Sequence, residues 1–385
     1  MNDINPYKNQ FLLDPSITFL NFGSFGACPK EIFEEYQRIQ LELEREPVQF
    51  IVFDGPEKLR DSRNILGKYL GVSGDDLVYV TNPSYAVNII AKNLNLKEGD
   101  ELLSTNLEYG ACDKTWEYYA NKKGFNYVKQ PITLPLTDKE TFVSDFFKGM
   151  NKNTKAIFIS HITSSTALRF PVEEICRIAK EKGLITIVDG AHAPAQIKLD
   201  ISEIEADYYL GACHKWMMAP KGASFLYVKK EFQNNLDPLI ISWGYGNDAI
   251  VESKLIDYHQ MQGTRDISAF LTIPKCIEFM TKNNWTEVTS NCKKIVRENA
   301  QRFAELMNTE CLAPINEDFI GQILSLKITF GKPELLQKKL FDNFKIEIPV
   351  MKHGNDYYLR FSINGFNSQR DLDQLYSAIN SMQSS

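Results

Sequence analysis

Two ionisable residues at the ends of successive apolar segments could carry out chemistry on an amino group. Lys215 lies in segment 211–216, and Asp189 ends the apolar run 184–188. A buried lysine could form a Schiff base with the aldehyde of pyridoxal phosphate, while an aspartate could pair with the protonated pyridine nitrogen and keep the ring an electron sink. Each residue alone is more often a surface charge or a helix cap, so this interpretation depends on the polar residues that accompany them.

Three further segments follow predicted strands and carry groups that suit such a cofactor. Segment 81–88 joins a strand to a helix, and Ser84 and the amide of Tyr85 lie at a helix start that favours a phosphate, although an ordinary cap would look the same. Tyr109 could stack on the pyridine ring or fill a gap in the core. In segment 161–167, a hydroxyl such as that of Thr163 or Ser164 could bond the phenolate oxygen of the cofactor.

Two histidines and an arginine complete the set of candidate residues. His192 follows Asp189 by three residues and could lie near the phenolate oxygen. His214 and Lys215 point to opposite sides of an extended segment, so His214 is expected to reach the phosphate. The planar fork of Arg360 suits a substrate carboxylate. Lys215 must lose its proton to attack an aldehyde, and removal from water beside other cations lowers a lysine pKa.

The composition excludes several classes of protein. The chain of 385 residues is 43% hydrophobic and 24% charged, as is ordinary for a globular protein. Its net charge of -6 does not indicate a basic surface that would bind nucleic acid. No apolar run is long enough to span a membrane, and residues 1–8 do not resemble a secretion signal. Seven scattered cysteines argue against a disulfide framework and against a metal site. We therefore expect a cytoplasmic protein with reduced thiols.

Strands and helices alternate through the middle of the chain, which predicts an α/β domain with a mostly parallel sheet. Strands are expected at 77–80, 100–104, 155–160, 184–188 and 208–211, and helices at 86–91, 116–122 and 172–182. Segment 223–228 follows too closely for a crossover helix, so it should pair antiparallel. Ligands bind at the carboxyl ends of such strands, where Asp189 and Lys215 would lie.

The pattern changes near residue 270. Long helical segments alternate with two apolar runs beyond it, which is typical of a smaller α+β domain; helices are expected at 293–307, 333–343 and 368–382, and strands at 323–328 and 357–362. We predict a large cofactor-binding domain over 18–270 and a small domain over 271–385, with the N-terminal segment 1–17 joined to the latter.

Six segments, taken together, resemble the class V aminotransferase family of fold-type I pyridoxal phosphate enzymes, in its isopenicillin N epimerase-like and cysteine desulfurase-like branch. They occur in the family's order, at 19–26, 82–88, 188–194, 214–216, 262–266 and 359–362. The resemblance implies the fold-type I architecture, pyridoxal 5′-phosphate as cofactor, and catalytic roles for Lys215, Asp189 and His192. It also implies that Arg360 and Asn21 bind the substrate.

The resemblance further implies a homodimer with shared active sites. In the family, the glycine and threonine that correspond to Gly263 and Thr264 cross the dimer interface and contact the partner's cofactor phosphate. The monomer would then have an incomplete site.

The departures from the family pattern bear on the reaction. Desulfurases carry a nucleophilic cysteine shortly before the carboxylate-binding arginine, but segment 346–354 has none and the last cysteine is Cys311, so a persulfide-forming desulfurase is not expected. We predict a β-eliminating carbon–sulfur lyase, which needs only Lys215 as base, or an epimerase, which also needs a second acid such as Tyr109 or Cys112. The alternatives are a class V aminotransferase and a non-catalytic regulatory protein that binds the cofactor. A nicotinamide enzyme is disfavoured because no Gly-x-Gly-x-x-Gly turn follows a strand.

Overall fold

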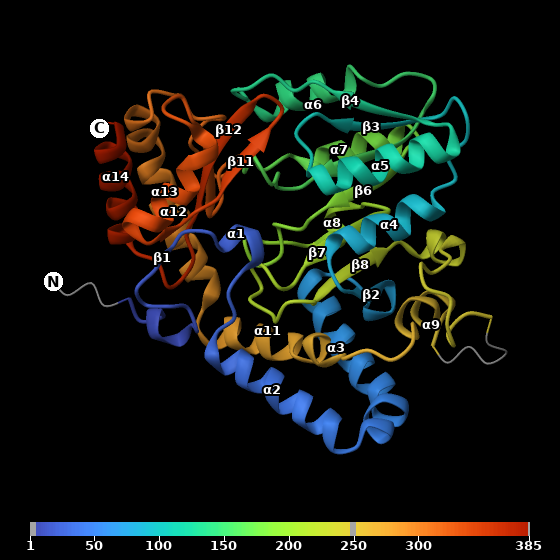
Figure 1. Cartoon of the computed structure of the whole chain (residues 1–385). Helices are drawn as coiled ribbons and strands as arrows, with labels where there is room; N and C mark the ends of the chain where they lie inside the picture. Colours follow the sequence, from blue (N-terminus) through green and yellow to red (C-terminus); the bar gives the residue numbers. More distant parts are fainter. Residues whose placement is uncertain (1–4, 247–251, 384–385) are drawn as a thin grey trace.

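The computed structural model describes residues 5–246 and 252–383, and a seven-stranded sheet lies at the centre of this part (Figure 1). Its strands occur in the order β2 (Leu77–Val80), β8 (Ser224–Val228), β7 (Tyr208–Ala212), β6 (Ile185–Asp189), β5 (Thr154–Ser160), β3 (Glu101–Thr105) and β4 (Asn126–Gln130). Strand β8 is antiparallel to both of its neighbours, as expected for 223–228, and the other pairings are parallel.

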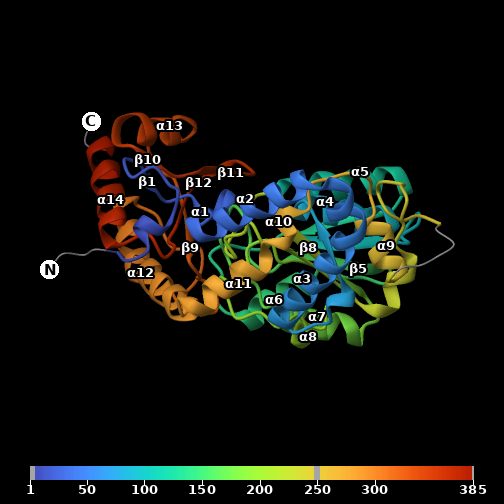
Figure 2. The ribbon, with the colours of Figure 1, turned by 90° about the horizontal axis from the view of Figure 1, so that it is seen from below.

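Helices cover both faces of this sheet (Figure 2). One face packs against α4 (Pro83–Asn93) and α5 (Gly110–Lys123), and the other against α3 (Gly55–Leu70), α6 (Lys139–Phe147), α7 (Val172–Glu181) and α8 (Ile201–Ile204). Strands buried on both sides consist of continuous apolar runs, which is why the sequence indicated them. The predicted apolar face of α7, formed by Val172, Ile175, Cys176 and Ala179, is the buried one.

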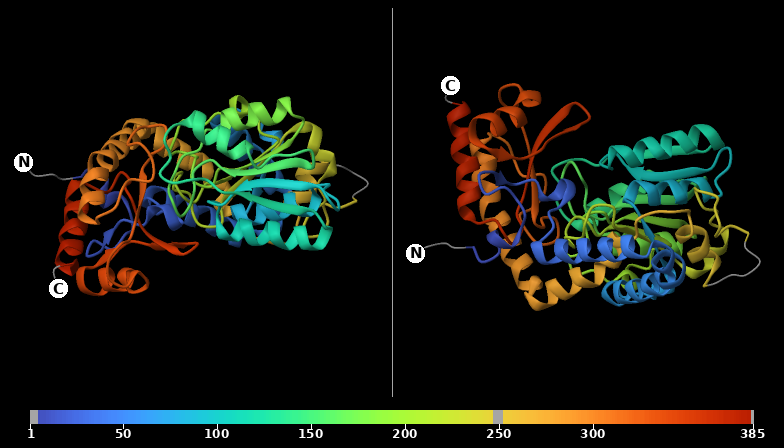
Figure 3. Two further views of the ribbon diagram at one scale, coloured as in Figure 1. Left: turned by 90° about the horizontal axis from the view of Figure 1, so that it is seen from above. Right: turned by 60° about the horizontal axis from the view of Figure 1, so that its bottom comes forward.

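The C-terminal elements form a second sheet (Figure 3). Strand β12 (Asp356–Ser362) pairs antiparallel with β11 (Val350–His353) on one side and with β9 (Ile323–Lys327) on the other. Three helices accompany this sheet: α12 (Trp285–Leu306), α13 (Pro333–Phe344) and α14 (Gln369–Gln383).

The N-terminal segment lies with these C-terminal elements (Figure 1). Strand β1 (Thr18–Phe19) pairs parallel with β10 (Ile346–Glu347), and the ring of Phe11 packs edge-on against that of Phe366. Residues 5–17 of the predicted joining segment belong to the described part of the chain and residues 1–4 do not, and the assignment of this segment to the small domain stays a prediction. The division of the chain at residue 270 stays a prediction.

Helices α2 (Lys30–Arg45) and α11 (Ile273–Lys282) run along the lower part of the molecule in Figure 1, near α3, and other short elements complete the chain. They include η1 (Lys8–Gln10), α1 (Phe22–Phe25), the π-helical turn η2 (Gln49–Asp54), η3 (Gly74–Asp76), η4 (Lys230–Asn235), α9 (Lys254–Gln260) and α10 (Ser268–Leu271). Among the helices of the described residues, none combines the length and apolar character needed to cross a membrane.

Gly26 fixes the approach of the N-terminal segment to Lys215. Its φ is 65°, and a Cβ atom there would lie 2.2 Å from the carbonyl oxygen of His214 and 3.0 Å from the Cα atom of Lys215. We expect Gly26→Ala to lower the free energy of unfolding by about 2–4 kcal/mol, because the backbone strain and the collision add. Urea denaturation measures this loss. Gly222→Ala is the matched control, since Gly222 has a φ of 94° but no atom within 4 Å of its added Cβ. Equal losses in both variants would contradict the steric argument.

Candidate active site

Polar side chains gather at the carboxyl edge of the central sheet because three adjacent strands are parallel. Ser160 at the end of β5 pairs in register with Asp189 at the end of β6, and Asp189 pairs with Leu210 in β7. The chain then continues from β7 to Lys215 within three residues. The sheet topology thus brings together Asp189 and Lys215, as the sequence predicted.

Lys215, His192 and Trp216 form a continuous chain of contacts. The Nζ atom of Lys215 lies 3.2 Å from Nε2 of His192, and the indole Nε1–H of Trp216 donates to Nδ1 of His192 at 3.2 Å. Burial lowers the pKa of Lys215 to about 8, and the charge of Arg360 acts in the same direction. Burial, reinforced by Lys215 and Arg360, also holds the pKa of His192 well below its usual value. The imidazole is therefore neutral near neutral pH, and the amine of Lys215 loses its proton far more readily than an ordinary lysine does.

The carboxylate of Asp189 is buried and held from two sides. Its Oδ1 accepts the amide N–H of Ala191 at 2.9 Å, and its Oδ2 accepts the thiol of Cys112 at 3.5 Å. Burial raises the pKa of Asp189, while Lys215 acts to lower it. The two residues interact electrostatically, yet no salt bridge joins them in the part of the chain that the structure describes.

Arg360 is a buried cation whose donors reach only neutral oxygens. The side chain is 2% exposed, and it donates from Nη1 to the carbonyl oxygen of Ser164 at 2.7 Å and from Nη2 to the hydroxyl of Ser24 at 2.9 Å. Within residues 5–246 and 252–383, no carboxylate forms a salt bridge with it. Burial lowers the pKa of Arg360 to about 10. An uncompensated buried charge is costly, so the site favours a bound anion.

Asn21 contacts Arg360 indirectly. Its Nδ2 donates to Oε1 of Glu347 at 2.8 Å, and its Oδ1 accepts the hydroxyl of Ser24 at 2.5 Å. Ser24 in turn accepts from Arg360. Asn21 therefore helps to position the guanidinium through Ser24, and its predicted direct contact with a substrate stays a prediction.

Ser84 and Tyr85 lie in the first turn of α4, where the sequence predicted a phosphate site. The side chain of Asn82 caps this helix by accepting the amide N–H of Tyr85 at 2.9 Å, so one of the expected donors already has a partner. The hydroxyl of Tyr85 donates to Oε1 of Gln262 at 3.1 Å. This bond links the start of α4 to the segment that carries Gly263.

The other predicted cofactor residues differ in their surroundings. Thr163 is fully buried, and its hydroxyl bonds to that of Thr166 at 2.7 Å and to the amide of Leu168 at 2.9 Å. Nδ1 of His214 lies 3.1 Å from the carbonyl oxygen of Ala223, and burial lowers the pKa of His214 to about 4. Tyr109 precedes α5 and is 44% exposed. The cofactor roles of these residues stay predictions.

Glu108 is a buried acid that the sequence interpretation missed. Its carboxylate accepts the amide N–H of Ser160 at 2.9 Å and the hydroxyl of Thr105 at 2.7 Å. Burial raises the pKa of Glu108 to about 8. It ties the loop before Tyr109 to the end of β5. A polar residue between two apolar strands gave a weak signal, because exposed loop acids look the same in sequence.

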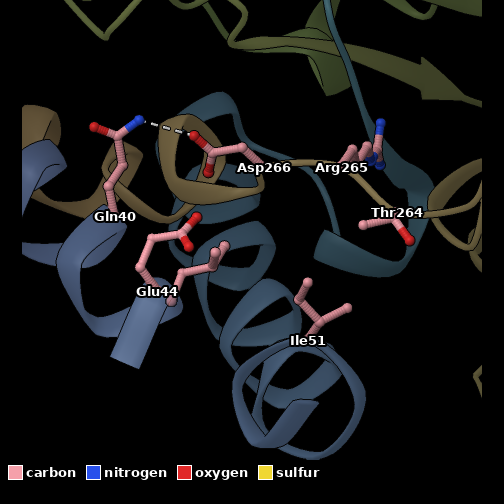
Figure 4. Close-up of a pocket in the computed structure, with 7 residues that line it drawn as sticks. Gln40, Glu44, Ile51, Thr264, Arg265 and Asp266 are labelled. Carbon is pink, nitrogen blue, oxygen red and sulfur yellow. Dashed lines mark hydrogen bonds between the residues drawn. The ribbon is translucent and has the colours of Figure 1, made fainter. Parts of the chain in front are cut away.

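Gly263 and Thr264 lie on an exposed segment of this chain. Gly263 has a φ of 94°, which favours glycine, and Thr264 lines a surface pocket. The other walls of this pocket come from α2 and η2, through Gln40, Glu44 and Ile51 (Figure 4). Both predicted interface residues are therefore open to a partner.

The comparisons with known proteins agree on one family. Residues 48–375 match the family model described as aminotransferase class-V. The chain is 28% identical over 386 residues to isopenicillin N epimerase of Streptomyces clavuligerus, with 97% of each chain covered. It is 26% identical over 402 residues to a probable chloroplastic L-cysteine desulfhydrase of Arabidopsis thaliana, covering 96% of this chain and 83% of that one.

Two solved structures show the same fold. One is the apo cysteine desulfurase from Thermococcus onnurineus NA1, with a TM-score of 0.82, 19% identity, and 100% of this chain and 99% of that one covered. The other is the K223A mutant of C-DES with glycine covalently linked to its PLP cofactor, with a TM-score of 0.84, 18% identity, and 97% and 99% covered.

Proposed function

The chain belongs to the class V aminotransferase family, and we propose that it is a β-eliminating carbon–sulfur lyase, with an isopenicillin N-type epimerase as the second candidate. It is a fold-type I enzyme, and its cofactor is pyridoxal phosphate. The observation that carries the proposal is the group formed by Lys215, Asp189 and Arg360. Among the described residues, it combines a partly buried amine of lowered pKa, a buried carboxylate without a salt-bridged cation, and a buried guanidinium without a salt-bridged anion.

The side chains present fit the cofactor. Asp189 would hold the ring nitrogen, because its buried carboxylate forms no salt bridge with a cation in the described part of the chain. Lys215 would bind the aldehyde carbon through Nζ, and Ser84 would donate to the phosphate. When bound, pyridoxal phosphate supplies an electron-withdrawing ring that weakens the bonds to the α-carbon of an amino acid.

Arg360 would then bind the substrate, and Lys215 would transfer the proton. Arg360 donates both arms of its guanidinium to the α-carboxylate and so orients the α-carbon. Lys215 removes the α-proton on Nζ, and a pKa of about 8 suits a base that works near neutral pH. Elimination follows when the bond from the β-carbon to sulfur breaks and the proton on Nζ passes to the departing sulfur.

Cys112 argues for the lyase over the epimerase. An epimerase needs a second acid to return a proton to the opposite face of the α-carbon. The thiol of Cys112 donates a hydrogen bond to Asp189, the residue proposed to hold the ring nitrogen. Burial raises the pKa of this thiol well above its usual value. Tyr109 is then the remaining candidate. The lyase requires no such group, since Lys215 alone moves the proton.

Incubation with a panel of amino acids tests the proposal. The lyase predicts exchange of the α-proton with deuterium oxide, together with release of pyruvate and ammonia. The sulfur should leave as sulfide from cysteine, as a thiol from a thioether, or as a persulfide from a disulfide. Exchange with inversion and no pyruvate would instead support the epimerase. Formation of the keto acid of the substrate would support the aminotransferase alternative. A protein that binds no pyridoxal phosphate and exchanges no α-proton would overturn the proposed function.

We also propose that the enzyme is a homodimer in the cytoplasm. The seven cysteines are free, which supports a reducing compartment. The exposed Thr264 supports a shared site, so Thr264→Ala should weaken cofactor binding by about 10-fold or more through loss of a hydrogen bond to a charged group. Equilibrium titration with pyridoxal phosphate measures this loss. Thr281→Ala, at an exposed threonine in α11, is the control and should bind normally.

Mixed dimers distinguish a shared site from a local one. Subunits that carry Lys215→Ala are combined with subunits that carry Thr264→Ala. If Thr264 serves the partner's site, each mixed dimer contains one site with an intact Lys215 and an intact Thr264. Cofactor affinity and turnover should then recover at that site. No recovery would contradict the shared phosphate contact.

A further inference from the structure

The indole of Trp216 determines which nitrogen of His192 carries the proton. An indole N–H can only donate, so Nδ1 of His192, which lies 3.2 Å from it, must present a lone pair. Both side chains are buried. Burial keeps the pKa of His192 well below its usual value, and the ring is therefore neutral. A neutral imidazole that accepts at Nδ1 carries its hydrogen on Nε2.

This Nε2–H points at Lys215. The two nitrogens are 3.2 Å apart, so the hydrogen needs an acceptor on Nζ. A neutral amine has a lone pair and can accept, whereas an ammonium group has only donors. Resting on the function proposed above, we infer that Trp216 is a positioning residue that favours the neutral, reactive form of Lys215 by fixing the tautomer of His192.

Other charged groups also act on Lys215, and they must be separated from this effect. Arg360 disfavours the ammonium form, whereas Asp189 and Cys112 favour it. His192 itself faces Lys215, Arg360 and His214. All of these charged groups remain in Trp216→Phe, and Trp116→Phe serves as a control for the smaller ring. A shift in that variant therefore reports on the hydrogen bond of Trp216.

Trp216→Phe removes the N–H and keeps an aromatic ring in the buried position. His192 is then free to carry its hydrogen on Nδ1 and to offer the Nε2 lone pair to a charged Lys215. A hydrogen bond of this kind stabilises the ammonium form, so the pKa of Lys215 should rise by about one unit.

The measurement is the rate at which apo-protein captures pyridoxal phosphate at different pH values. Neutral Nζ adds to the cofactor aldehyde and water leaves, and borohydride traps the product on Lys215. In Trp216→Phe, the midpoint of the rate profile should move up by about one pH unit, with an unchanged rate at high pH. The rate near pH 7 should fall about tenfold.

Trp116→Phe is the matched control. Trp116 is also fully buried, but its Nε1 has no hydrogen-bond partner, so its loss should leave the profile unchanged. An unshifted midpoint in Trp216→Phe, or an equal loss of rate at every pH, would overturn the inference while leaving the proposed function intact. A wild-type protein that captures no pyridoxal phosphate would overturn both.

A second measurement observes the wild-type protein and does not require Trp216→Phe to fold. The ring nitrogens of the five histidines can be labelled with ¹⁵N, and His192→Gln identifies the signals of His192. The inference predicts a protonated Nε2 and an unprotonated Nδ1 in the wild-type apo-protein. Protonation at Nδ1 instead would overturn it.

Discussion

Lys215→Ala is expected to abolish turnover and the covalent attachment of pyridoxal phosphate while leaving the protein folded. Loss of a positioned general base alone costs about 10²–10⁴ in rate, and Lys215 is proposed to hold the cofactor as well. Turnover should therefore fall by at least about 10³-fold. Absorbance of the purified protein and borohydride trapping measure the loss of covalent attachment, and exchange of the α-proton measures the loss of turnover. Lys155→Ala, at an exposed lysine of β5, is the control.

The same variant should show how the burial of Lys215 affects stability. Burial lowers the pKa of this lysine from 10.5 to about 8, so between these pH values the unfolded chain binds a proton that the folded chain does not. Stability must then rise with pH across this window. The wild-type apo-protein should gain stability relative to Lys215→Ala as the pH rises from about 8 to about 10.5. Parallel stability curves, or a variant that still exchanges the α-proton, would contradict the role assigned to Lys215.

The central sheet could be predicted because its strands are buried on both faces. The run 156–159 is apolar throughout, and the structure has β5 at Thr154–Ser160. Strand β4 was not predicted, because it lies at an edge of the sheet, most of its residues are polar and none is fully buried. The hairpin strand β11 was missed for the same reason. The opposite edge strand, β2, is buried along its whole length and has the apolar run that β4 and β11 lack, which is why it was predicted.

Only those site residues that lie at the ends of neighbouring strands could be predicted from the sequence to meet. Asp189 ends β6 and Lys215 follows the end of the adjacent parallel strand β7 by three residues, so their meeting follows from the strand order. The contact between Ser24 and Arg360 joins residues 336 positions apart, and no local pattern indicates it. The thiol of Cys112 on Asp189 joins residues 77 positions apart. Such contacts depend on how the C-terminal elements and α5 pack, which periodicity does not determine.

Replacement of Arg360 is expected to weaken the binding of the substrate strongly and to leave the attachment of the cofactor intact. Arg360→Gln removes the charge and the fork, so kcat/KM for an amino acid should fall by about 10²–10³-fold, as expected for one partner of a buried charge pair. Arg360→Lys keeps the charge but cannot donate two parallel hydrogen bonds, so its loss should be intermediate. Arg302→Gln, which removes an exposed salt bridge to Asp373, is the control.

A substrate analogue without the carboxylate isolates the contact. If Arg360 binds the α-carboxylate, the wild-type enzyme should prefer cysteine to cysteamine. Arg360→Gln should lose most of this preference, because neither substrate can then form an ion pair with residue 360. The variant should also be at least as stable as the wild-type apo-protein, since it removes a buried cation without a carboxylate partner in the described part of the chain. A variant that unfolds, or one that keeps its preference for the carboxylate, would mean that Arg360 serves the packing of β12 rather than the substrate.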